Sequence, residues 1–202
     1  LLRGVKTWFK RISEIAKSEG VIVEHYIISS GLSEIIEGTP IAKYFKRIYA
    51  CEFHYNERGN ADWAQQAINF TTKTQFIFRI SKGVLDTVDD YTLNSYVSEN
   101  DRRIPYRNMI YIGDGLTDVP CMTVVRDRGG ESIAIYHKGE EDKAYKLIQE
   151  NRVGYIAYAD YSKDCELENI VKQLIKKMAI VDYLERRHEQ ELQESRKPQG
   201  KK

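Results

Sequence analysis

The chain has 202 residues, of which 42% are hydrophobic and 30% are charged, a composition typical of one soluble globular domain with a full core. Its formal net charge of +1 argues against a general attraction to nucleic acid or to an anionic membrane, and no apolar run is long enough to span a bilayer. Cys51, Cys121 and Cys165 are odd in number and widely spaced, so they predict reduced thiols of a cytoplasmic protein, not a disulfide framework or a zinc site.

The chain opens with an amphipathic helical pattern that ends near Gly20, followed by a strand at 25–29 that runs into Ser30-Gly31. A new helix is expected from about Ser33. The first residue, Leu1, is not Met, and the chain opens inside a predicted helix, so the chain is expected to lack its natural N-terminus. The absence of a signal peptide is therefore uninformative.

The remaining pattern continues the alternation of helices and strands that is typical of a parallel sheet. The expected elements are a short helix or turn at 44–48, strands at 49–55 and 62–69 joined by a turn at 56–60, a helix at 72–82, a helix and then a loop over 86–103, a strand at 109–112, a helix at 118–125, a strand at 131–136, a helix at 140–151, a strand at 153–159, and a closing helix with an apolar face from 167 to 178.

These elements predict an α/β fold: a three-layer, Rossmann-like domain with a mainly parallel sheet and a small β-hairpin. The domain is expected to cover residues 1–183 and to be incomplete at its N-terminal side. Residues 184–202 are almost entirely charged or polar, and they predict a frayed helix and a disordered tail.

The most informative stretch runs from Met109 to Asp118, where a buried strand ends in a glycine-flanked acidic turn. Asp114 follows the carboxyl end of the strand and Asp118 begins the next helix, and ligands of open α/β sheets bind in that crevice. Two converging carboxylates repel each other unless a cation lies between them, and Mg²⁺ suits that role. The alternative is that both aspartates only shape a turn and cap a helix.

Two further segments carry polar groups suited to phosphate. Ser29, Ser30 and Gly31 follow a strand and offer hydroxyl and backbone N–H donors, although a plain serine N-cap without a ligand is the better explanation when they are taken alone. Lys73 stands at the start of a helix, where the helix dipole disfavours a cation unless an anion is near; the alternative is a solvated surface lysine. Acidic turn, hydroxyl turn and lysine together describe a Mg²⁺-assisted phosphate site.

On these motifs the sequence resembles the haloacid dehalogenase (HAD) superfamily, in particular phosphatases of the phosphoserine-phosphatase type, over about residues 2–159. The resemblance implies that Ser29, Ser30 and Gly31 bind phosphate, and that Lys73 is a catalytic group that neutralises the phosphoryl group. It further implies that Asp114 is a Mg²⁺ ligand, and that Asp118 either joins the metal shell or orients the lysine as a catalytic group.

One motif of that superfamily is missing. Its members use an Asp-x-Asp motif on an N-terminal strand, with a nucleophilic aspartate, and no such motif precedes Ser29. Either the nucleophile lies upstream of this sequence, which we favour, or the chain is a degenerate, non-catalytic relative.

The resemblance thus implies hydrolysis of a small phosphate monoester through an aspartyl-phosphate, with this chain inactive by itself. The alternatives are a phosphate- or metal-binding module without turnover, and an interaction domain that uses residues 176–202.

Overall fold

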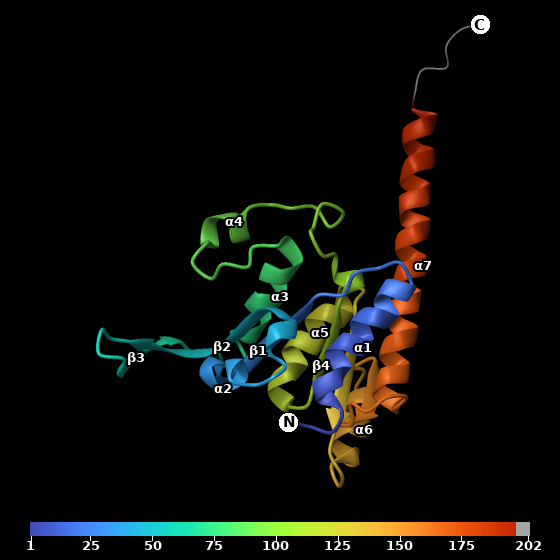
Figure 1. Cartoon of the computed structure of the whole chain (residues 1–202). Helices are drawn as coiled ribbons and strands as arrows, with labels where there is room; N and C mark the ends of the chain where they lie inside the picture. The colour runs from blue at the N-terminus through green and yellow to red at the C-terminus, as the bar shows by residue number, and fades with distance from the viewer. Residues whose placement is uncertain (197–202) are drawn as a thin grey trace, which may run out of the picture.

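The computed structural model describes residues 1–196, which form two three-stranded sheets with helices on both sides (Figure 1). The strands are β1 (His25–Leu32), β2 (Phe45–Tyr55), β3 (Ala61–Gln66), β4 (Ile110–Gly113), β5 (Glu131–Tyr136) and β6 (Tyr155–Tyr158). The helices are α1 (Val5–Ser18), α2 (Ser33–Glu37), α3 (Lys73–Lys82), α4 (Asp90–Asn94), α5 (Val119–Asp127), α6 (Glu141–Gln149) and α7 (Glu166–Ser195), with 3₁₀ turns η1 (Ala42–Tyr44), η2 (Tyr106–Asn108) and η3 (Leu116–Asp118). None of the helices within this range is long and apolar enough to cross a membrane.

Strand pairing confirms the mainly parallel arrangement. β4, β5 and β6 pair in parallel in that order, and β1 pairs in parallel with β2. β2 then turns back into β3 as an antiparallel hairpin, which extends from the body of the domain in Figure 1. The predicted hairpin after the serine segment is therefore confirmed.

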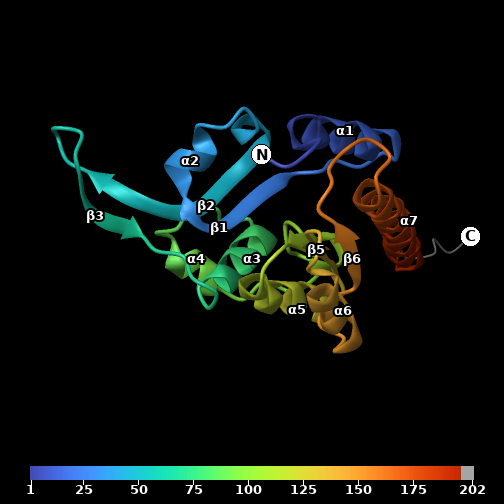
Figure 2. The same ribbon diagram turned by 90° about the horizontal axis from the view of Figure 1, so that it is seen from below.

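The three layers follow from the side-chain alternation of β5. Ile133 and Ile135 point to one face and pack with α1 and α7, where Trp8 and Leu167 are buried. Ala134 points to the other face and packs with α5 and α6. Figure 2 shows the same division, with α1 and α7 on one side of the sheet and α3, α5 and α6 on the other. The predicted three-layer, Rossmann-like α/β fold is thus confirmed.

The two sheets meet at β1 and β4 without strand pairing. Within residues 1–196, β1 pairs only with β2 and β4 only with β5. Ile28 of β1 and Tyr111 of β4 nevertheless lie in one apolar cluster with Ile77 of α3. The two halves are therefore joined by side chains beneath the sheets, and an edge of each sheet remains open where they meet. This explains why the apolar residues of β1 are only half-buried.

One predicted element before β4 is wrong. Residues 45–48 belong to β2 and not to a helix or turn, because parallel pairing with β1 begins at Phe45 opposite His25. Residues 86–103 contain the short helix α4 followed by a loop, as predicted. The buried guanidinium of Arg79 donates hydrogen bonds to the backbone carbonyls of Asp86 and Thr87, which holds this segment as a loop.

The closing helix is longer than expected. α7 continues to Ser195, so residues 184–195 are helical and the expected disorder is wrong for them. Ion pairs four residues apart, such as Arg187 with Glu191, support this part of the helix, and Glu185 pairs with Arg107 of η2. The rest of the expected tail, residues 197–202, lies outside the described residues.

Candidate functional site

The centre of the candidate site is a buried ion pair between Lys73 and Asp118. Lys73 is the first residue of α3, as predicted, and its Nζ lies 2.7 Å from Oδ1 of Asp118. The two side chains are 6% and 10% exposed, and Thr117 Oγ1 lies 3.5 Å from the same nitrogen. A lysine at a helix N-terminus was expected to have an anion nearby. That anion is Asp118, which is 45 positions away in the sequence.

The turn after β4 is shaped to hold the Asp118 carboxylate. Gly113 ends the strand, and a Cβ atom at this position would lie 2.7 Å from Cβ and 2.8 Å from Oδ2 of Asp118. Only glycine leaves room for the aspartate here. Oδ1 also accepts a hydrogen bond of 2.9 Å from the Tyr111 hydroxyl, and Oδ2 accepts one of 3.4 Å from the Gly115 N–H. Both oxygens of Asp118 are thus bonded within the protein.

The surroundings of this pair are largely buried and apolar. Burial, and next the charge of Asp118, raise the pKa of the Tyr111 hydroxyl, so the group remains a donor at neutral pH. Burial also raises the pKa of the neighbouring Cys121 thiol to about 11. Cys121 is therefore an unreactive core residue, because the thiolate is the nucleophilic form.

Asp114 has a different setting. It directly follows β4, is exposed, and makes no hydrogen bond or ion pair with any described side chain or backbone group. Burial, and next the charge of Asp114, raise the pKa of Tyr161 to about 12. A free carboxylate of this kind suits a hard cation such as Mg²⁺. Residues 1–196 bring no three His, Cys, Asp or Glu side chains together as a metal site, so further ligands would have to be water, backbone oxygens or groups from elsewhere.

The serine segment lies in a bulge of β1 and not in a turn after it. Ile28 pairs with Tyr49 and Leu32 with Cys51, so residues 29–31 stand opposite a single residue of β2. Ser29 Oγ accepts a hydrogen bond of 3.0 Å from the Gly31 N–H, while Ser30 and Gly31 are exposed. No hydrogen bond or ion pair in the described part of the chain links this segment to Lys73 or Asp118. Their connection is the shared apolar cluster beneath them.

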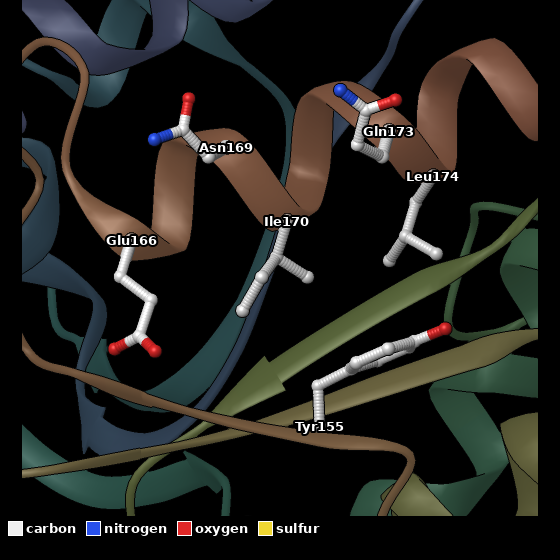
Figure 3. A pocket seen from close by; sticks show the side chains of 6 residues that line it. All are labelled: Tyr155, Glu166, Asn169, Ile170, Gln173 and Leu174. Atoms are coloured by element: carbon white, nitrogen blue, oxygen red, sulfur yellow. The ribbon is translucent and has the colours of Figure 1, made fainter.

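A surface hollow lies elsewhere, between β6 and α7 (Figure 3). Its lining includes Tyr155, Ile170, Leu174 and the amides of Asn169 and Gln173. It shares no residue with the Lys73–Asp118 pair, and its lining contains no lysine, arginine or histidine that could neutralise a phosphate, while its one charged group is the carboxylate of Glu166. We therefore place the candidate site at the carboxyl end of β4.

The structure adds Tyr111 to the residues that the sequence singles out. In the sequence it is part of an apolar strand and indicates only a core residue. The signal that identifies it is chemical, because a buried tyrosine hydroxyl normally requires a hydrogen-bond partner. That partner is one of the two predicted site aspartates.

Comparison with known proteins finds a relative by sequence and a similar fold among solved structures. No family model matches the chain. An uncharacterized protein of Borreliella burgdorferi is 33% identical over 192 residues, which cover 85% of this chain and 65% of that protein. The crystal structure of cytosolic 5′-nucleotidase IIIB bound to cytidine matches 87% of this chain and 56% of its own, with a TM-score of 0.50 and 15% identity. At this identity the likeness shows the fold alone, a Rossmann-like α/β fold.

Proposed function

We propose that this chain is part of a Mg²⁺-dependent phosphohydrolase of the HAD type that acts on small phosphate monoesters. The observation that carries the proposal is the buried Lys73–Asp118 pair beside the acidic turn at the carboxyl end of β4. A buried ammonium held by one carboxylate at a sheet edge suits the stabilisation of a transferring phosphoryl group. The fold shared with a protein named as a 5′-nucleotidase supports a phosphorylated substrate.

Each residue has a proposed role. The Lys73 ammonium, the Ser29 hydroxyl and the N–H groups of Ser30 and Gly31 bind phosphoryl oxygens. Asp118 orients Lys73: the sequence leaves two roles open for this residue, and its contacts favour orientation because both of its oxygens are already bonded. Its role as a metal ligand stays a prediction.

Asp114 is the proposed Mg²⁺ ligand of this chain, since its carboxylate is exposed and free. The bound cation would supply charge neutralisation at the phosphate.

The nucleophile is proposed to come from a strand outside these 202 residues that adds between β1 and β4. The support is geometric, because both strands present an edge without a partner where the two sheets meet. A carboxylate on that strand would attack phosphorus and expel the substrate alkoxide, which takes up a proton and leaves as an alcohol. Water would then cleave the acyl phosphate and release inorganic phosphate. The chain alone is therefore expected to be inactive.

The test is phosphate release from p-nitrophenyl phosphate by the native protein that contains this chain, with and without Mg²⁺. Lys73→Met is expected to lower kcat by a factor of about 10² to 10³. The matched control is Lys138→Met, which replaces an exposed lysine outside the site and should leave kcat unchanged. No release by the unaltered native protein, or equal rates for it and Lys73→Met, would overturn the proposal.

A second candidate is an interaction domain, favoured by one observation. Ile180, Tyr183 and Leu184 of α7 are more than half exposed. In that case, the triple variant Ile180→Ser/Tyr183→Ser/Leu184→Ser would abolish binding of a partner, and no phosphatase activity would be found in the native protein. The phosphohydrolase proposal expects the same variant to leave phosphate release unchanged.

A further inference from the structure

The strand β4 sends one polar side chain into the layer that carries the candidate site. Ile110 and Ile112 pack with the cluster of α1 and α7, whereas Tyr111 points to the opposite face, toward α3 and α5. Its hydroxyl reaches Oδ1 of Asp118 at 2.9 Å, the same oxygen that binds Lys73. The tyrosine hydroxyl and the lysine ammonium therefore share one acceptor atom.

We propose that Tyr111 is a positioning residue, which fixes the Asp118 carboxylate and through it the Lys73 ammonium. This inference rests on the proposed function of Lys73 in phosphate chemistry. Tyr111 itself does not touch the substrate.

The geometry explains why a third group is needed. An aspartate carboxylate turns readily about its terminal torsion, and an ammonium is a compact charge without directional preference in its partner. The pair alone would therefore leave the lysine free to move with the carboxylate. Tyr111 and the Gly115 N–H each donate to a different oxygen of Asp118, and together they define the plane of the carboxylate.

Gly113 restricts movement of the Asp118 side chain toward the end of β4. The Asp118 side chain lies so close to this glycine that a Cβ there would overlap it. Two hydrogen-bond donors, Tyr111 and the Gly115 N–H, and the steric contact with Gly113 thus fix the carboxylate independently of Lys73. An apolar residue at position 111 would fill the same space in the core but would remove one of the two donors.

Tyr111→Phe is the variant that separates these functions, because it keeps the ring in the cluster and removes only the hydroxyl. In the native protein with p-nitrophenyl phosphate and Mg²⁺, kcat is expected to fall about tenfold, with KM unchanged within a factor of about two. A residue that only packs in the core would leave kcat unchanged. Tyr158→Phe, on the exposed part of β6, is the matched control.

A second readout does not depend on activity. The ¹H–¹⁵N signal of the Lys73 side-chain ammonium, assigned by its loss in Lys73→Arg, is measured in the native protein that contains this chain. A buried ammonium in a fixed ion pair exchanges slowly and gives a sharp signal, which we expect to broaden or shift in Tyr111→Phe and to persist in Tyr158→Phe. An unchanged signal in Tyr111→Phe, or no Lys73 signal in the unaltered chain, would overturn the positioning role. If the native protein releases no phosphate, the proposed function fails, but this signal still decides the role of Tyr111.

Discussion

The losses of unfolding free energy caused by replacing Lys73 and by replacing Asp118 should not add, because the two side chains form one buried ion pair. The side chains are 6% and 10% exposed, so water cannot solvate a charge that is left without its partner. Lys73→Met leaves a buried carboxylate supported only by Tyr111 and the Gly115 N–H. Breaking a buried pair in this way costs about 3–5 kcal/mol of the free energy of unfolding.

The double variant Lys73→Met/Asp118→Asn carries neither charge. Its loss of unfolding free energy should be smaller than the sum of the two single losses, with a coupling of about 2–3 kcal/mol. Urea denaturation followed by circular dichroism measures all four proteins under the same conditions. Losses that add to within about 0.5 kcal/mol would refute the reasoning, because they would mean that the two charges do not interact in solution.

Three further predictions concern single positions. Gly113→Ala should lower the free energy of unfolding by about 1–3 kcal/mol, because its Cβ would overlap Asp118. In the matched variant Gly115→Ala, the new Cβ would lie 3.4 Å from its nearest neighbour, Thr117 Oγ1, so the loss of unfolding free energy should be smaller. Equal losses for the two variants in urea denaturation would contradict the overlap at Gly113. Glu24 has its pKa lowered to about 2, chiefly by the hydrogen bond from Arg103, so its stabilisation is complete above about pH 4.5 and is lost as the pH falls toward 2. After solvent screening, the contribution of Glu24 to the free energy of unfolding is about 1 kcal/mol. The urea midpoints of the unaltered chain and Glu24→Gln should therefore differ at pH 7 and converge near pH 2. A midpoint difference that does not change with pH would contradict the role given to the Glu24 carboxylate. Asp114→Asn should change the unfolding free energy by less than about 0.5 kcal/mol while abolishing the Mg²⁺ dependence of phosphate release by the native protein; unaltered Mg²⁺ dependence would remove it as a ligand.

The fold was largely predictable because its signals are local. The alternation of apolar strands with amphipathic helices requires only short-range periodicity, and it indicated the parallel sheet and the hairpin correctly. The misplacement of Lys73 at a helix N-terminus predicted a nearby anion, and the structure shows Asp118 in that position. In both cases the signal itself is local, either a periodicity or a lysine in the first turn of a helix, although the anion that Lys73 meets is 45 positions away.

The features that sequence reasoning missed depend on distant partners. The bulge at residues 29–31 arises from the register between β1 and β2, which no local pattern specifies. The loop after α3 is held by a buried arginine, Arg79, and a single arginine in a helical pattern indicates an exposed face. Tyr111 was missed for the same reason, because the role of its hydroxyl depends on the hydrogen bond to Asp118, which the sequence does not show.

The most direct test of a site completed by a strand from outside these 202 residues is to locate the phosphoryl group during turnover. The native protein is mixed with a ³²P-labelled phosphate monoester and Mg²⁺, quenched in acid and cleaved into peptides. We expect an acid-stable, hydroxylamine-sensitive acyl phosphate on an aspartate outside these 202 residues, and a large loss of labelling in Lys73→Met. Label on a residue within this chain, or phosphate release without any labelled aspartate, would contradict the proposal that a separate strand between β1 and β4 supplies the nucleophile.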